Sequence, residues 1–297
     1  LTMTASNQRP AIVARRLTKR YGSVAALTDL DFTIAEGEAV ALWGANGAGK
    51  TTLLRCVLGL ARSTGELDIF GVDPRRDGRA ARELIGYVPQ DLPVSPMTVG
   101  EQIVFITRLK RASLESAREQ LAQLGLGGEE GKRIDALSGG MRQRLSLVLA
   151  LIGSPRVLLF DEPTANLDAR GRAELLTLLQ RLKQEGRTVL FSSHRPEDVL
   201  TLADRVLMLE GGHLREAKTP RQFEQDLGNA HLVITLRNGH LQQALSTLSS
   251  LGYDGAGEGH VLTVPVRLRE KADVISVLAR EGIDIADFDV EQVGWTK

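Results

Sequence analysis

The segment from Gly44 to Thr51 reads Gly-Ala-Asn-Gly-Ala-Gly-Lys-Thr and has the residue types of a phosphate-binding loop. Glycines let backbone N–H groups converge on phosphate oxygens, and a helix that starts at the end of the loop adds its partial positive charge. Lys50 is expected to reach the β- and γ-phosphates of a nucleotide, and the Thr51 hydroxyl is expected to bind Mg²⁺. The residues expected to hold the nucleotide are Gly44, Ala45, Asn46, Gly47, Ala48, Gly49, Lys50, Thr51 and Thr52.

The chain on either side of this loop supports that interpretation. An apolar strand is expected over Ala39–Trp43, directly before the loop, and an apolar helical pattern follows over Thr52–Leu60. A strand, a glycine-rich loop and a helix in this order form the context in which such a loop binds phosphate. The alternative interpretation, a glycine-rich turn with an accidental Lys-Thr pair, does not require this context.

Two adjacent acids, Asp161 and Glu162, follow the apolar run Val157–Phe160. Neighbouring side chains that leave the end of a strand point in different directions, so the two carboxylates are expected to have different roles. Asp161 is expected to hold Mg²⁺, and Glu162 is expected to polarise the water that attacks the terminal phosphate. The alternative is a pair of solvated acids that merely end a strand.

The segment Leu137–Gln143 reads Leu-Ser-Gly-Gly-Met-Arg-Gln and resembles the signature motif of ABC-type ATPases. The resemblance extends over about residues 11 to 215, and the motifs occur in the family's order. It implies that Tyr21 stacks on adenine, that Gln90 is the Q-loop glutamine and a further Mg²⁺ ligand, and that His194 is the switch histidine. It also implies that Asn166, Leu167 and Asp168 form the D-loop.

The same resemblance implies that two such subunits pair head to tail, with ATP between the phosphate loop of one and the signature of the other. Ser138, Gly139 and Gly140 precede an expected helix, Met141–Ile152, so their N–H groups and the helix dipole are suited to the γ-phosphate. The catalytic residues implied are Glu162, His194 and Lys50. The chain departs from the family pattern at Asn166 and Arg195-Pro196, which concern the geometry of the subunit interface more than hydrolysis.

Short β-branched runs alternate with longer amphipathic runs up to about residue 215, which predicts an α/β domain with a largely parallel sheet. The resemblance makes this domain, residues 11–220, a P-loop NTPase with a RecA-like core and an antiparallel β subdomain. A helical insertion is expected over about residues 91–137, with helices at Val99–Lys110 and Leu114–Leu124. The expected strands are Ile12–Leu17, Leu30–Ile34, Ala39–Trp43, Leu67–Phe70, Ile85–Val88, Val157–Phe160, Thr188–Ser192 and Arg205–Glu210.

A smaller domain is expected over residues 221–297, and after Gly228 the chain matches itself at an offset of 30 positions, which indicates a duplicated strand-helix-strand unit. The alternative is a chance similarity between two α/β pieces. Two such units predict a smaller α+β domain with a ferredoxin-like βαββαβ order. Its glycines, Gly252, Gly255, Gly257 and Gly259, suit either a small-ligand site or a spacer domain. The matched positions are Leu232 with Leu262, Arg237 with Arg267, Leu245 with Ile275, Ser246 with Ser276, Leu248 with Leu278, Gly252 with Gly282 and Asp254 with Asp284.

The composition of the 297-residue chain narrows its class. Its 37 basic and 37 acidic residues leave no net charge to attract nucleic acid. Its longest apolar runs fall short of the roughly 20 residues that span a bilayer. The single Cys56 suits a buried thiol in a reducing compartment, and residues 1–10 are expected to be a disordered tail. The chain is expected to lie peripherally at the cytoplasmic face of a membrane.

The signature ending Gly-Met-Arg-Gln-Arg and a short C-terminal extension resemble the ATPases of ABC-2-type exporters and of systems that support metallocofactor maturation. The resemblance implies ATP and Mg²⁺ as cofactors, a second ATPase subunit (a homodimer is expected) and separate transmembrane permease subunits as partners. One alternative is an amino-acid-type importer ATPase whose C-terminal domain senses substrate. Another is a non-transport ATPase of iron–sulfur assembly.

Overall fold

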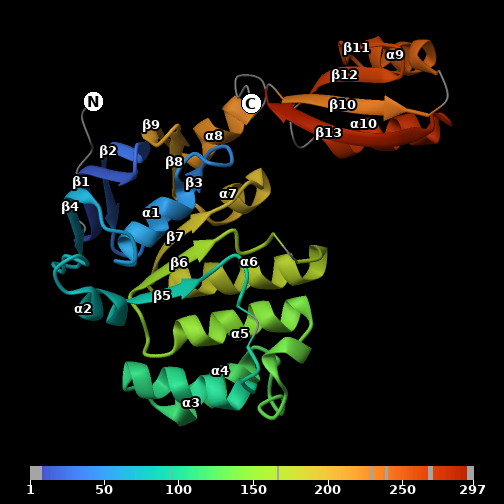
Figure 1. Ribbon diagram of the computed structural model, residues 1–297. Helices are drawn as coiled ribbons and strands as arrows, with labels where there is room; N and C mark the ends of the chain where they lie inside the picture. The colour runs from blue at the N-terminus through green and yellow to red at the C-terminus, as the bar shows by residue number, and fades with distance from the viewer. Residues whose placement is uncertain are drawn as a thin grey trace. The chain divides into compact units, whose positions relative to one another are not determined.

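The computed structural model describes residues 9–93, 95–165, 167–227, 230–237, 240–266 and 270–292. The chain divides into two compact units, residues 1–220 and 221–297 (Figure 1). Most of the expected N-terminal tail lies outside the described residues, but Pro10 already belongs to the first strand. Among the described residues no helix is both long and apolar enough to cross a membrane.

The first unit is built on a six-stranded sheet with the order β5-β6-β7-β3-β8-β9. The first five strands pair in parallel, and β9 pairs antiparallel with β8. Strands β3, β6 and β7 are buried at every position, as expected for central strands covered on both faces. The sequence predicted all of these strands except β9. Their bounds are β3 Ala39–Trp43, β5 Ile85–Val88, β6 Val157–Asp161, β7 Thr188–Ser192, β8 Arg205–Glu210 and β9 His213–Lys218.

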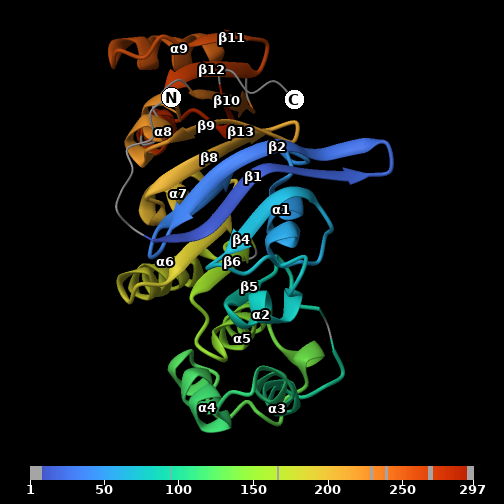
Figure 2. The same cartoon turned by 90° about the vertical axis from the view of Figure 1, so that its left-hand side faces the viewer.

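A separate three-stranded antiparallel sheet with the order β2-β1-β4 forms the β subdomain (Figure 2). Strands β1 and β2 form a long hairpin whose pairing continues as far as Tyr21 and Val24, so both strands run further than their apolar runs predicted. The register of the hairpin shifts at several positions. Their buried side chains share one core with helix α1 and part of the central sheet. The bounds are β1 Pro10–Tyr21, β2 Val24–Ala35 and β4 Thr64–Ile69.

The helices of the first unit fall into two groups. One group packs with the sheets: α1 starts at Lys50, two residues before the expected helix, and α6 and α7 follow β6 and β7. The other group, α3, α4 and α5, forms a helical subdomain with its own apolar core. A capping box between Thr98 and Glu101 starts α3. The bounds are α1 Lys50–Val57, α2 Gly78–Glu83, α3 Val99–Lys110, α4 Leu114–Gln123, α5 Gly139–Leu151, α6 Ala169–Gln184 and α7 Pro196–Leu202.

The second unit confirms the predicted ferredoxin-like order. Its four strands are all antiparallel in the order β11-β12-β10-β13. Matched repeat positions are equally buried, because Leu232, Leu262, Leu248 and Leu278 all lie fully inside its core. Arg267 lies outside the described residues. The bounds are α8 Pro220–Leu227, β10 Ala230–Leu236, α9 Leu241–Ser250, β11 Ala256–Glu258, β12 Val261–Val266, α10 Lys271–Arg280 and β13 Ile285–Gln292.

Candidate functional site

The phosphate loop, Gly44–Thr51, joins the end of β3 to the start of α1. Gly49 has a φ of 108°, and a Cβ there would lie 2.7 Å from Leu27 Cδ2 and 2.8 Å from the Ala26 carbonyl oxygen. Only glycine fits this position, because its backbone lies in the left-handed region and touches β2. The loop therefore turns tightly enough to bring its N–H groups to the start of the helix.

Lys50 is the first residue of α1 and is buried. Its Nζ donates hydrogen bonds to the carbonyl oxygens of Gly44 at 2.6 Å and Ala45 at 3.2 Å. Burial lowers the pKa of the Lys50 ammonium, and the nearby Glu162 and Asp161 carboxylates oppose that shift. The Lys50 ammonium thus lies against the carbonyl oxygens of its own loop, and the two nearby carboxylates favour its positive charge.

Asp161 ends β6 and is buried. Its Oδ1 accepts hydrogen bonds from Thr51 Oγ1 at 3.1 Å and from Ser192 Oγ at 2.8 Å. Ser192 ends the neighbouring strand β7, and its Oγ also accepts the backbone N–H of Glu162 at 2.9 Å. Sequence reasoning missed Ser192, whose single hydroxyl links both acids to β7.

Glu162 has a φ of 50°, a left-handed conformation that is uncommon outside glycine. Its Oε2 lies 2.7 Å from His194 Nδ1 and accepts the His194 backbone N–H at 3.2 Å. The Glu162 side chain is 13% exposed and that of His194 is 55% exposed. The strained turn after β6 therefore directs the carboxylate toward the loop that follows β7, where the histidine faces solvent.

These groups line one cavity of about 440 Å³, here called the nucleotide cavity. It lies where β3, β6 and β7 end, the edge at which open parallel sheets bind ligands. Of the predicted nucleotide-binding residues, Gly44, Ala45 and Ala48 support the loop without lining this cavity. Its lining residues are Ala26, Asn46, Gly47, Gly49, Lys50, Thr51, Thr52, Gln90, Asp161, Glu162 and His194.

Tyr21, which was expected to stack on adenine, does not line the nucleotide cavity. It ends β1 beside the hairpin turn, and 46% of it is exposed. Lys19 Nζ lies 4.3 Å from the centre of its ring, a cation–π contact. One face of the Tyr21 ring is therefore partnered by this cation.

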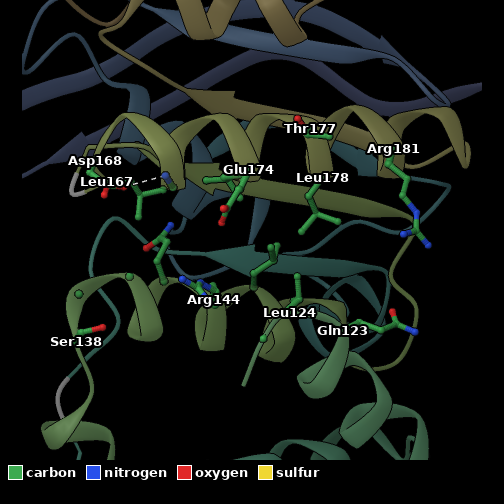
Figure 3. A pocket seen from close by; sticks show the side chains of 17 residues that line it. Gln123, Leu124, Ser138, Arg144, Leu167, Asp168, Glu174, Thr177, Leu178 and Arg181 are labelled. Carbon is green, nitrogen blue, oxygen red and sulfur yellow. Dashed lines mark hydrogen bonds between the residues drawn. The ribbon is translucent and has the colours of Figure 1, made fainter. Parts of the chain in front are cut away.

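The signature and D-loop residues line a different cavity, a cleft of about 840 Å³ between α5 and α6 that is here called the signature cleft. Figure 3 shows Ser138 at the start of α5 and Asp168 at the start of α6, with the side chains of the two helices facing one another. Ser138 Oγ accepts the N–H of Met141 at 3.3 Å, and Asp168 Oδ1 accepts the N–H of Gly171 at 2.8 Å. None of the described residues belongs to both linings. Asn166 lies outside the described residues.

The backbone at Gly139 and Gly140 is open, since a Cβ at either position would meet no atom within 4 Å. The signature residue Gln143 reaches back toward the acids, and its Nε2 donates to the Pro163 carbonyl oxygen at 2.9 Å. The signature group and the nucleotide cavity are thus separate surfaces of one chain, connected through the turn that follows Glu162.

A buried network behind the cavity was also missed by sequence reasoning. Asp198, on α7, is only 1% exposed. Its carboxylate accepts from Thr164 Oγ1, from Ser193 Oγ at 3.3 Å and from Arg172 Nε at 2.6 Å. These partners come from the turn after Glu162, the loop that contains His194, and the first turns of α6. One buried carboxylate therefore ties together the three segments that carry the acid, the histidine and the D-loop.

The nucleotide cavity lies at the carboxyl edge of a parallel sheet and is surrounded by lysine, hydroxyl and carboxylate groups. This arrangement makes the first unit a P-loop nucleoside triphosphatase. The family model described as ABC transporter matches residues 27–165. The chain is 34% identical to the daunorubicin resistance ATP-binding protein DrrA3 of Streptomyces coeruleorubidus, over 93% of this chain and 90% of that protein. This chain accordingly belongs to the ATP-binding proteins of ABC transporters, and it is an ATPase.

Two further comparisons agree with this assignment. The Fe(3+) ions import ATP-binding protein FbpC of Escherichia coli (strain K12) is 36% identical, over 73% of this chain and 64% of that protein. A solved dimeric post-hydrolysis state of the ATP-binding cassette MJ0796, bound to ADP and Pi, superposes with a TM-score of 0.64 at 26% identity. That match covers 71% of this chain and 99% of the other. The relatives thus include both a daunorubicin resistance protein and an iron import protein.

Proposed function

We propose that this chain hydrolyses ATP held between two ATPase subunits and so drives separate transmembrane subunits. The observation that carries the proposal is that two groups of the predicted site residues line two different cavities of the chain. The phosphate loop, the two acids and His194 share the nucleotide cavity, whereas Ser138, Gly139 and Gly140 open onto the signature cleft. A single chain therefore supplies the two complementary halves of a site at different places, and a homodimer would complete two sites at once.

ATP binding follows from the groups at the phosphate loop. When phosphates enter, Lys50 Nζ would exchange the carbonyl oxygens of Gly44 and Ala45 for phosphate oxygens, which are stronger acceptors. The loop N–H groups and the start of α1 add their own positive potential. The carboxylates at Asp161 and Glu162 favour the charged form of the lysine, which offsets its burial.

The donor set of the nucleotide cavity fits Mg²⁺, which prefers hard oxygen ligands and usually keeps several waters and phosphate oxygens. Thr51 Oγ1 and Asp161 Oδ1 are already 3.1 Å apart, and Gln90 lines the same cavity. We assign these three residues to the ion, directly or through water. Bound there, Mg²⁺ would neutralise charge that develops on the phosphates.

Glu162 is suited to act as the base that orients and polarises the attacking water. Its carboxylate is largely buried, faces the cavity and is held by both the side chain and the backbone of His194. His194 is the more exposed partner, so it is placed to respond to the γ-phosphate and to the partner subunit's signature. Loss of the γ-phosphate would then remove the link between the two subunits.

Replacement of Glu162 by glutamine tests this proposal. Glu162→Gln keeps the size of the side chain but removes the base, so turnover should fall by about 100-fold or more. ATP affinity should stay within about threefold, because the phosphate contacts remain. Steady-state phosphate release, nucleotide binding and ATP-dependent dimer formation in size-exclusion chromatography are the measurements. Glu258→Gln, an exposed acid of the second unit, is the control and should behave like the wild type. Rapid turnover by Glu162→Gln would refute the assignment.

We further infer that the transporter exports its substrate. The similarity to the daunorubicin resistance protein covers 93% of this chain and so includes most of the second unit, whereas the similarity to the iron importer leaves more than a quarter of the chain unmatched. On this reading the chain lies peripherally at the cytoplasmic face of the membrane. Uptake and efflux of labelled candidate substrates by inverted vesicles test the direction, and ATP-dependent loss from the vesicle lumen would contradict it.

A further inference from the structure

A groove of about 610 Å³ runs along β13 in the second unit, between this strand and α10. Figure 1 labels the two elements that flank it. Its walls are mainly apolar, and Phe288 stands beside it with 48% of its surface exposed. Large exposed apolar side chains next to a hollow are typical of binding surfaces rather than of a free domain. The groove, here called the β13 groove, is lined by Ile275, Ala279, Gly282, Ile283, Asp284, Ile285, Ala286, Asp287 and Phe288.

The groove lies beside an open sheet edge. In the described part of the chain β13 pairs only with β10, so its other side carries backbone groups without a strand partner. The Phe288 N–H donates at 2.8 Å to the Asp287 side chain instead of to a strand. A free edge next to an apolar groove is the arrangement by which domains accept an extended peptide as an additional strand.

The opposite edge of the same sheet provides an internal comparison, because β11 and β13 occupy matched places in the repeat. At β11, a Cβ on Gly257 would lie 2.6 Å from Leu241 Cδ1, and one on Gly255 would lie 3.2 Å from Leu245 Cδ2. Helix α9 therefore lies directly on the glycines of β11. The matched positions of β13 are Ile285 and Asp287, which line the groove. Both β11 and β13 are edge strands, but α9 covers the sheet face at β11 whereas a groove remains beside β13, and these two glycines serve close packing rather than a ligand site.

Charge indicates what the open edge accepts. Asp284 and Asp287 line the groove, and none of the described residues that line it is basic. Asp289 follows on the same exposed strand. A second copy paired antiparallel through β13 would bring Asp287 and Asp289 of both copies together, and like charges across a strand pair are destabilising. An occupant with Lys or Arg at alternate positions would instead be attracted.

We propose that the β13 groove binds an extended, Lys- and Arg-bearing cytoplasmic segment of the membrane subunits as a fifth strand of the sheet. Short cytoplasmic segments of membrane proteins carry an excess of Lys and Arg. Such a segment would place apolar side chains against Phe288 and Ile275 and its cations beside Asp284 and Asp287. This inference rests on the proposed function, because it takes its partner from there, but it assigns the second unit a task of its own.

The first test uses the full chain and a labelled, end-capped peptide of sequence Val-Lys-Val-Lys-Val-Lys-Val, followed by fluorescence anisotropy. Wild-type protein should bind it more tightly than the Val-Glu counterpart. A variant that carries both Asp284→Lys and Asp287→Lys should bind the peptide about tenfold more weakly, because several weak surface ion pairs are lost together. Glu258→Lys, on the other edge strand β11, where α9 covers the sheet face, is the matched control and should change binding by less than about twofold.

Equal binding of the Val-Glu peptide would overturn the inference, as would wild-type affinity in the double variant or an equal loss in Glu258→Lys. ATP turnover is measured on the same samples. Normal turnover without peptide binding defeats the groove inference alone, whereas absent turnover in the wild type defeats the proposed function.

The second test identifies the source of the segment in cells. A photo-reactive phenylalanine derivative at position 288 is cross-linked, and the attached peptide is sequenced by mass spectrometry. A Lys- and Arg-bearing peptide from a protein with membrane-spanning helices supports the inference. A peptide from a second copy of this chain, or from a protein without such helices, contradicts it. The same derivative at position 258 is the control and should give no such product.

Discussion

The nucleotide cavity and the β13 groove both contain carboxylates, but they hold them in opposite ways. Asp161 and Glu162 are largely buried, and each has at least one hydrogen bond to a neighbouring strand or loop. Asp284 and Asp287 are exposed on a strand edge. Buried acids fixed in place suit reactions that need defined geometry, whereas exposed acids suit recognition of a mobile cationic partner. The same residue type therefore indicates chemistry in one unit and docking in the other.

The largest effect on folding is expected from Asp198. Asp198→Asn breaks the buried pair with Arg172 and should lower the free energy of unfolding by about 3 to 5 kcal/mol. Because the network also positions the segments of Glu162 and His194, turnover at saturating ATP should fall while KM for ATP changes little. Urea unfolding and steady-state kinetics measure the two effects.

The exposed pair between Arg15 and Glu66 is the control for that prediction, with both side chains at least 70% exposed. Glu66→Gln should change stability by less than about 1 kcal/mol and leave turnover unaltered. If Asp198→Asn and Glu66→Gln changed stability and turnover equally, burial would not distinguish structural acids from surface acids in this protein.

A core substitution in the second unit should separate the two units. Leu278 is fully buried in the core of residues 221–297. Leu278→Ala should lower the free energy of unfolding of that unit by about 3 kcal/mol through the cavity it creates. Turnover of ATP in solution should stay at the wild-type rate, because the two units have separate cores. Calorimetry measures the stability of the second unit, and phosphate release measures ATP turnover. If Leu278→Ala lowered turnover together with stability, the two units would not be independent.

Cys56 gives the smallest effect and extends the comparison to a neutral group. Burial raises the pKa of its thiol from 9.0 to about 11. The unfolded chain therefore ionises first, so the stability contributed by the neutral thiol is complete below pH 9 and is lost as the pH rises to 11. The loss should be about 2 kcal/mol at pH 10.5 and should approach about 2.7 kcal/mol above pH 11, from two pKa units at 1.36 kcal/mol each. Urea unfolding at pH 8 and at pH 10.5 measures the free energy of unfolding at the two pH values. Its decrease between them should be smaller for Cys56→Ala than for the wild type.

Much of the first unit could be predicted because its strands are continuous apolar runs. Strands β3, β5, β7 and β8 have the predicted bounds. Strand β9 could not be found, since its six residues are mostly exposed and charged and only its pairing with β8 makes it a strand. The helix α5 begins at Gly139, earlier than the apolar pattern suggested, because Ser138 caps it.

The candidate site was predictable where its residues form continuous motifs, as in the phosphate loop. Ser192 and Asp198 were not, because a single serine or aspartate carries no pattern and their importance comes from contacts with residues about 30 positions away. The β13 groove was also invisible in the sequence. The repeat suggested two equivalent halves, and only the packing of α9 on Gly255 and Gly257 distinguishes the covered face at β11 from the groove at β13.

The hydroxyl of Ser192 has a consequence for how the enzyme can be regulated. Its oxygen accepts a hydrogen bond from the backbone N–H of Glu162, and its O–H donates one to Asp161. Asp161, assigned to the metal, and Glu162, assigned to the water, are therefore joined through one oxygen atom. Neither acid can then shift without disturbing the other. Under the proposed function, control of turnover would therefore come from contacts that change around this pair of acids, namely those of the nucleotide, of His194 and of the partner subunit's signature surface.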